Sequence, residues 1–226
     1  MVAKTSLSRT TIGVVALVLG LTATLAAGAA APRTFLIDVQ HSRSLIQVGK
    51  SGAFSFLAGH THEVEAPLSG GVVHLDPADP AGADVRLQFD AAAMRVTGKG
   101  EPPDDVPKVQ EVMLGKRVLD VEHYPTITFE STGVSARRAT PTALDLTIAG
   151  KMTIHGVTQP VTAPVSVTLD GGTLTATGTF TIKQSDYGIR PISVVGVVNV
   201  KDTLTMTFTI IAKERAAALS GAGRPD

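Results

Sequence analysis

The sequence predicts an all-β protein whose antiparallel strands close into an extended barrel, with one short helix at the mouth. Apolar and polar residues alternate at the strand period of two in about eight or more segments. The outward positions are rich in threonine, which suits a solvated strand surface. A single long sheet would expose its apolar face, whereas a barrel hides that face and removes the sheet edges. A two-sheet sandwich with a filled core is the alternative.

The N-terminal segment, residues 1–31, has the pattern of a signal peptide. Lys4 and Arg9 provide a positive start, and an apolar run follows from Ile12 to Leu25. Ala27–Ala31 offers a small-residue cleavage site before Pro32. An uncleaved anchor is the alternative, but the apolar run is short for a spanning helix, which needs about 20 residues. We therefore expect export to the periplasm or the medium, with no stable membrane span after cleavage.

The composition is that of a globular protein, and it excludes several kinds of functional site. The 226 residues are 43% hydrophobic and include no cysteine, so disulfides, thiolate metal sites and cysteine nucleophiles are excluded. Removing Lys4 and Arg9 leaves 18 of the 20 basic side chains against 20 acidic ones. A nucleic-acid partner would require a basic face, so none is expected.

Strands fill the first part of the remaining chain. Turn residues at Gly49–Gly52, Pro67 and Gly70–Gly71 are expected to separate them, and the loop Asp76–Gly82 is rich in proline and glycine. The expected strands are Thr34–Val39, His41–Val48, Ala53–Ala66, Val72–Leu75 and Val85–Asp90.

A short helix is expected over Val106–Lys116, after a polar, proline-containing stretch. Asp105 is a candidate cap and Gly115 a candidate stop. A helix this short must pack against the rest of the protein to be stable. Its apolar stripe could cover the mouth of the barrel and includes Val109, Val112 and Met113.

Strands return after the helix, and Gly171–Gly172 predicts a tight hairpin turn. The domain is expected to span residues 32–213, and residues 214–226 are read as a disordered tail. The expected strands are Thr126–Glu130, Leu144–His155, Val161–Leu169, Leu174–Lys183, Val194–Val200 and Leu204–Ala212.

Two histidines share one face of the strand expected over Ala53–Ala66. His60 and His62 follow Phe54 and Phe56 at the same parity, so an apolar face continues into two imidazoles. Same-face neighbours lie about 7 Å apart, which lets two imidazoles share a metal ion or contact a haem-like ligand. Two ligands are too few, however, and the alternative is a polar rim where imidazoles meet water or a ligand head group.

The inward face carries few bulky groups. Several inward positions are alanine or glycine, and aromatic residues make up only 4% of the chain, which favours a cavity over a filled core. The phenylalanines that fall on the inward parity are Phe54, Phe56, Phe89, Phe129, Phe180 and Phe208.

Motifs of the common hydrolases and of phosphate-binding loops are missing from the sequence. His155 is better explained as a turn residue before Gly156 than as a member of a catalytic triad. The sequence therefore favours a binding protein over an enzyme.

Four motifs, in order, resemble the YceI-like domain family. Asp120–Thr132 is similar to its central motif and Gly150–Val161 to its second hallmark. Asp38–Ser42 resembles its opening motif and Ser185–Ile189 its late one. The resemblance covers about residues 35–213. It departs at His60–Gly70, where a Gly-x-Phe pattern is usual, and at Val118–Leu119, where paired phenylalanines are usual.

The resemblance implies a lipocalin-like barrel, usually periplasmic, with an elongated apolar pocket for polyisoprenoid chains or related amphiphiles. We therefore expect a hydrophobic small-molecule partner, such as an isoprenoid lipid or an isoprenoid quinone. A metal- or haem-binding envelope protein that uses His60 and His62 is the alternative. The sequence leaves the ligand's identity and a homodimer open.

Overall fold

A computed structural model describes residues 32–51, 61–194 and 198–216. Within those ranges the chain forms twelve strands, one α-helix and two short 3₁₀ turns. The strands are β1 (Arg33–Ile37), β2 (Arg43–Ser51), β3 (His62–Glu65), β4 (Leu68–Leu75), β5 (Asp84–Asp90), β6 (Arg95–Val96), β7 (Thr126–Ala139), β8 (Ala143–Ile154), β9 (Val157–Asp170), β10 (Thr173–Lys183), β11 (Ser193–Val194) and β12 (Val198–Glu214). The helix is α1 (Val106–Leu114), and the 3₁₀ turns are Pro80–Gly82 and Gln184–Tyr187.

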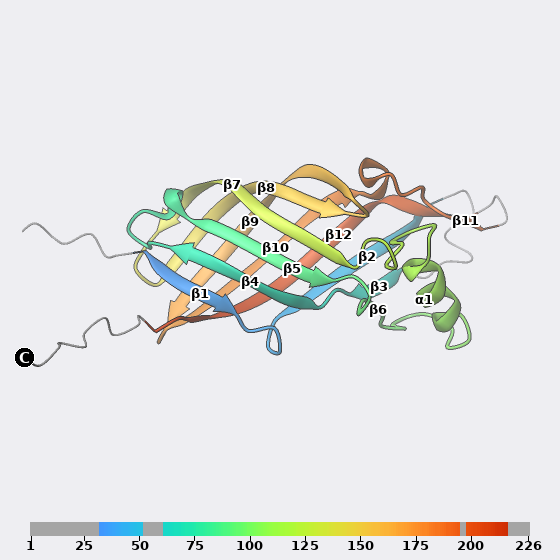
Figure 1. The fold of residues 1–226 in the computed structure, drawn as a ribbon, viewed down its shortest axis with the longest axis horizontal. Helices are drawn as coiled ribbons and strands as arrows, with labels where there is room; N and C mark the ends of the chain where they lie inside the picture. The colour runs from blue at the N-terminus through green and yellow to red at the C-terminus, as the bar shows by residue number, and fades with distance from the viewer. Residues whose placement is uncertain (1–31, 52–60, 195–197, 217–226) are drawn as a thin grey trace, which may run out of the picture.

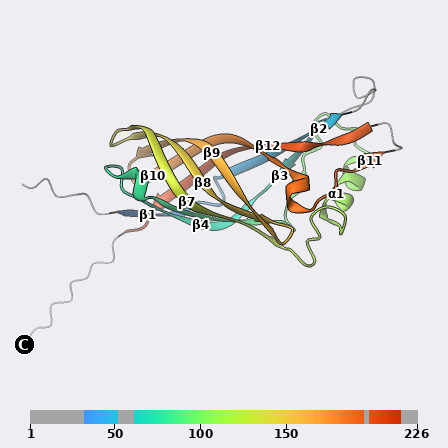
Figure 2. The ribbon, with the colours of Figure 1, turned by 90° about the horizontal axis from the view of Figure 1, so that it is seen from above.

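Eight strands close into an antiparallel barrel, in the order β1-β4-β5-β7-β8-β9-β10-β12, because β1 also pairs with β12. The barrel is elongated, and α1 lies at one end of it in both views (Figures 1 and 2). Beyond its contact with β1, β12 continues toward that end and pairs with β2, which leads on to β3 and β6. The predicted all-β barrel with a single helix is therefore confirmed.

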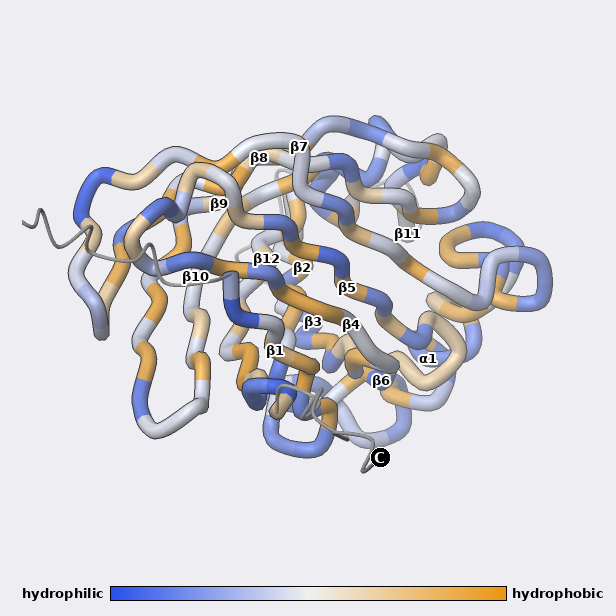
Figure 3. Tube along the Cα trace, turned by 60° about the vertical axis from the view of Figure 1, so that its left-hand side comes forward, coloured by the Kyte–Doolittle hydropathy of each residue, from blue (hydrophilic) through white to orange (hydrophobic). Residues whose placement is uncertain are grey.

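Strand alternation produces the barrel wall. Hydrophobic and hydrophilic residues alternate along the strands in Figure 3. In β9, for example, Val165 and Val167 are buried, whereas Ser166 and Thr168 are exposed. The period-two pattern thus places one set of side chains in the interior and the other in solvent. The hairpin turn at Gly171–Gly172 is confirmed, and both glycines have the positive φ angles that such a turn requires.

An ion pair reinforces the pairing of β1 with β12, which closes the barrel. The Arg33 guanidinium donates two hydrogen bonds to the Glu214 carboxylate, with Nε 2.7 Å from Oε1. These bonds hold the pKa of Glu214 below its ordinary value. Glu214 was expected to begin a disordered tail, but it ends β12, and the Arg215 backbone N–H donates to the Thr34 carbonyl at 2.7 Å. The tail prediction is wrong for these residues, and residues 217–226 lie outside the described ranges.

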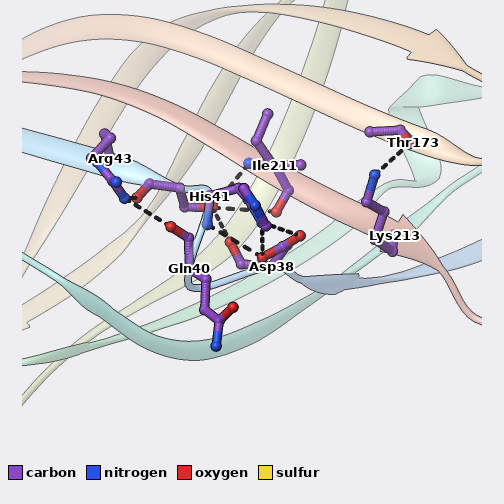
Figure 4. A network of polar contacts seen from close by, with 8 residues as sticks. Asp38, Gln40, His41, Arg43, Thr173, Ile211 and Lys213 are labelled. Atoms are coloured by element: carbon purple, nitrogen blue, oxygen red, sulfur yellow. Dashed lines mark hydrogen bonds and ion pairs between the residues drawn. The ribbon is translucent and has the colours of Figure 1, made fainter.

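The turn between β1 and β2 is tied to β12 by polar contacts (Figure 4). The Asp38 carboxylate lies 2.9 Å from Nδ1 of His41, a hydrogen bond that lowers the pKa of Asp38. The hydroxyl of Ser42, which is buried, donates to the Asp38 carbonyl at 2.7 Å and accepts from the Ile211 backbone N–H at 3.0 Å. These bonds hold the turn beside Ile211, between the part of β12 that pairs with β1 and the part that pairs with β2.

The helix is fastened to the barrel through a glutamine. The Gln110 side chain accepts a hydrogen bond from the Val96 N–H at 2.8 Å and donates to the Met94 carbonyl at 2.8 Å. Because an isolated helix this short is marginal, these bonds and its apolar face supply the stability it needs. Asp105 is the N-cap residue and Gly115 the C-cap residue, as expected. The Asp105 side chain, however, makes no capping hydrogen bond and lies 3.3 Å from Nζ of Lys108.

Several expected strand boundaries are wrong. β2 runs through Gly49 to Ser51, and β4 runs through Gly70–Gly71 without a break. Pairing with β5 continues through Gly70 and Gly71 of β4 and outweighs the weak strand preference of glycine. β7 extends to Ala139, and β12 is one continuous strand with an irregularity between Val200 and Leu204. Of the strand expected over residues 53–66, the structure describes only β3 and its immediate surroundings.

Candidate functional site

A cavity of about 300 Å³ lies inside the barrel at the end that carries α1. Its wall is mostly aliphatic, and the exposed side chains of Lys108 and Val112 on α1 mark where it meets solvent. Its described lining residues are Ile46, Val48, His62, Val64, Ala66, Phe89, Met94, Lys108, Val109, Val112, Met113, Val118, Leu119, Ile127, Met152, Ile154, Ile182, Gln184, Tyr187, Ile189, Ile192, Val200, Leu204 and Met206.

A second cavity, of about 100 Å³, continues into the closed part of the barrel. Along β12 the first cavity is lined up to Met206, and the second is lined from Met206 to Ile210. Phe89 and Met152 also belong to both walls, so these two residues and Met206 form the partition between the cavities. Methionine has a flexible side chain that adapts to irregular spaces, so two of the three partition residues can repack around a chain.

Small residues and close backbone approaches shape this interior. A Cβ atom built on Gly150 in β8 would lie 2.5 Å from the Phe129 ring, and one on Gly178 would lie 2.6 Å from the Phe208 ring. Glycine at these positions therefore lets the two rings lie against the wall beside the smaller cavity.

Four residues with polar side chains line the larger cavity within the described part of the chain: His62, Lys108, Gln184 and Tyr187. The Gln184 amide donates to the Lys201 carbonyl at 2.8 Å. The hydroxyl of Tyr187, a residue only 1% exposed, is buried and has no hydrogen-bond partner among the described residues. Burial, followed by the nearby charge of Asp186, raises the pKa of Tyr187 to about 12.

The 3₁₀ turn Gln184–Tyr187 brings two of these residues into the wall. Its anchor is Asp202, whose carboxylate accepts a hydrogen bond from the Ser185 hydroxyl at 2.7 Å and one from the Ser185 N–H at 2.9 Å. These bonds hold the pKa of Asp202 below its ordinary value of 3.8. A surface contact thereby fixes the backbone that orients the buried Gln184 and Tyr187.

His62 forms an ion pair at the cavity rather than part of a metal cluster. Its Nδ1 lies 2.8 Å from Oε1 of Glu101, whose side chain is only 2% exposed. The two atoms are close but poorly aligned for a hydrogen bond, so the contact is electrostatic. No group of three metal-ligating side chains occurs among the described residues, and His60 lies outside them.

The expected site residues divide between the two cavities. His62, Phe89, Val109, Val112 and Met113 line the larger one, as their strand parity and helical stripe predict. The smaller one is lined by Phe89, Phe129, Phe180 and Phe208. Phe54 and Phe56 lie outside the described residues, and ligand contact by the whole set stays a prediction.

Sequence reasoning missed two polar residues of the wall. Tyr187 and Gln184 lie in a turn outside any regular strand, so no strand period could place them inside. The motif Ser185–Ile189 was a signal, because it stood out as a similarity without an assigned role. Glu101, in a stretch read as irregular, carried no signal of its long-range contact with His62.

None of the helices among the described residues is long and apolar enough to cross a membrane.

Comparison with known proteins identifies a family. The profile described as the YceI-like domain matches residues 35–212. UPF0312 proteins from Pseudomonas savastanoi pv. phaseolicola and Pseudomonas syringae pv. syringae are each 28% identical over 182 residues, covering 77% of this chain and 85% of their own. The crystal structure of Burkholderia cenocepacia BcnA aligns with a TM-score of 0.56 and 22% identity, over 78% of this chain and 99% of BcnA. This structural likeness shows a shared fold.

Proposed function

This chain belongs to the YceI-like domain family, and from that premise we propose that it is a non-enzymatic binding protein that carries a hydrophobic, isoprenoid-like amphiphile inside its barrel. The observation that carries the proposal is the larger cavity, about 300 Å³ in volume and walled mainly by aliphatic side chains. Cavities of about 300–1,000 Å³ with few polar groups are typical small-molecule sites.

An apolar chain would bind there chiefly by losing its contact with water. Each Å² of apolar surface removed from water contributes about 25 cal/mol, before the costs of association and ordering. A chain that buries about 300 Å² would gain about 7.5 kcal/mol, against an association cost of about 4–15 kcal/mol, so a longer chain that buries more surface would bind more tightly. The smaller cavity beyond Phe89, Met152 and Met206 would give a longer chain room to continue.

The mouth suits the polar end of such a ligand. Lys108 and the His62–Glu101 pair lie at the larger cavity or beside it, where a head group could remain near water. Val118 and Leu119, at positions where the family resemblance implies phenylalanines, also line this cavity and leave more of its width open.

Native mass spectrometry of the purified protein, before and after organic extraction, tests this proposal. We expect a lipid adduct that extraction removes and that an added isoprenoid quinone replaces. Val112→Asp places a charge at the mouth and should lower retention. Val39→Asp makes the same change on a valine of similar exposure (40% against 38%) in the β1–β2 turn and should have no effect. Absence of any adduct or uptake, or equal retention in both variants, would contradict the proposal.

We also propose that the protein is exported. Support comes from the positive start at Lys4 and Arg9, the apolar run from Ile12 to Leu25 and the small residues of Ala27–Ala31. Cell fractionation and mass determination of the mature protein should find it outside the cytoplasm, with an N-terminus near Pro32. A full-length protein in the cytoplasmic fraction would refute export without affecting the binding proposal.

A further inference from the structure

The Tyr187 hydroxyl is a buried hydrogen-bonding group without a partner among the described residues. Tyr187 is only 1% exposed and lines the larger cavity from the 3₁₀ turn that follows β10. Buried polar side-chain atoms in proteins are nearly always hydrogen-bonded, because leaving one unpaired costs its full desolvation penalty. An oxygen atom of a bound ligand that reached this hydroxyl would supply the missing partner.

The other polar side chains of the wall each lie close to another polar group of the protein. The Gln184 amide donates to the Lys201 carbonyl at 2.8 Å, and Nδ1 of His62 lies 2.8 Å from the Glu101 carboxylate. Nζ of Lys108 lies 3.3 Å from the Asp105 carboxylate and is at the exposed mouth. Tyr187 thus has a hydroxyl that a ligand can engage without displacing a protein hydrogen-bond partner among the described residues.

The surroundings of Tyr187 favour a neutral acceptor over an anion. Most neighbouring lining residues are aliphatic, and an anion would lose its hydration there for a single neutral donor. With its pKa raised to about 12, the phenol stays protonated near neutral pH and keeps a proton to donate. A carbonyl or ether oxygen meets both conditions, because it accepts a hydrogen bond and costs less to bury than a charge.

We infer that Tyr187 is a specificity-determining residue that donates a hydrogen bond to a neutral oxygen acceptor on the ligand, so that the cavity prefers oxygen-bearing chains to plain hydrocarbons and to anionic head groups. This inference rests on the proposed function and names the chemical class of its ligand. The ligand oxygen accepts this hydrogen bond inside the cavity, apart from the charged residues at the mouth.

Displacement of the fluorophore N-phenylnaphthylamine by two isoprenoids tests the inference. Farnesylacetone carries one ketone oxygen, and farnesene has a similar isoprenoid chain without oxygen. In Tyr187→Phe, affinity for farnesylacetone should fall about three- to tenfold, as expected for loss of one hydrogen bond, while affinity for farnesene stays the same. Tyr124→Phe, which makes the same change at the chain's other tyrosine, outside both cavity walls, should alter neither.

The stability of the variant distinguishes a role of Tyr187 in ligand recognition from a structural role. Because the Tyr187 hydroxyl has no described partner to lose, ligand-free Tyr187→Phe should unfold at the same urea concentration as the wild type or at a higher one. A large loss of stability in Tyr187→Phe would show a structural role and overturn the inference. Equal weakening of both isoprenoids, or of neither, would also overturn it while leaving the proposed function intact.

The wild-type protein alone provides a further readout. The infrared carbonyl stretch of bound farnesylacetone should lie below its value in a hydrocarbon solvent, as it does for a hydrogen-bonded ketone. A stretch unchanged from hydrocarbon would overturn the inference, and so would tighter binding of farnesyl phosphate than of farnesylacetone. Failure of all three isoprenoids to displace the fluorophore would overturn the proposed function as well.

Discussion

Filling the larger cavity should stabilise the ligand-free protein and block binding. Ala66 is 2% exposed and lines the cavity just after β3, so Ala66→Leu adds three carbon atoms to the wall. The cavity of about 300 Å³ is roughly ten times a water molecule's share of liquid volume, about 30 Å³, so the added carbons fit.

The magnitude follows from the number of carbons buried. Each buried methylene contributes about 0.8 kcal/mol, or about 2.4 kcal/mol for three, and ordering a leucine side chain costs about 0.5–1 kcal/mol. The free energy of unfolding of Ala66→Leu should therefore rise by about 1–2 kcal/mol. For a domain of this size that corresponds to an increase of roughly 2–8 °C in Tm.

Urea and thermal unfolding of the ligand-free protein measure this change, and fluorophore displacement measures binding. Ala212→Leu is the matched control, because Ala212 is 0% exposed and belongs to neither cavity wall. Overpacking at such a site costs about 1–3 kcal/mol. If Ala66→Leu is destabilised as much as Ala212→Leu, or binds ligand as well as the wild type, the reasoning from the cavity is wrong.

Two further changes test the close packing at Gly150 and the hydrogen bonds between Ser185 and Asp202. Gly150→Ala should lower the free energy of unfolding by about 1–3 kcal/mol because its Cβ would lie 2.5 Å from the Phe129 ring, whereas Gly133→Ala, with nothing within 4 Å, should leave it unchanged or raise it. Equal urea midpoints for these two variants would contradict the close approach. The Ser185 hydrogen bonds lower the pKa of Asp202, so they contribute stability that is complete above its ordinary value of 3.8 and is lost as the pH falls through the lowered pKa. Urea unfolding between about pH 6 and pH 2 should therefore show a smaller loss of stability on acidification in Ser185→Ala than in the wild type; parallel curves would rule out this linkage.

The alternation of apolar and polar residues was enough to predict the barrel. Once Val165 and Val167 must be buried and Ser166 and Thr168 solvated, the strand period leaves a barrel or a two-sheet sandwich, and the barrel is the one that also removes the sheet edges. The same pattern placed His62 and Phe89 in the wall, and the helical stripe placed Val109, Val112 and Met113 at the mouth.

Local patterns failed where neighbouring strands or solvent decided the outcome. Residues 131–139 of β7 are largely exposed on both faces, so no alternation marked them as a strand, and pairing with β8 alone makes them one. Gly70–Gly71 suggested a break, yet pairing with β5 continues through both glycines and keeps β4 continuous.

The barrel, its inward apolar face and the family could be predicted because they depend on periodicity and motifs that are local along the chain. The open part of the interior, the contact of Glu101 with His62 and the hydroxyl of Tyr187, unpaired among the described residues, could not be predicted in this way. Those features depend on how side chains distant in sequence fill a shared volume. Packing in three dimensions, which no local pattern encodes, sets that arrangement.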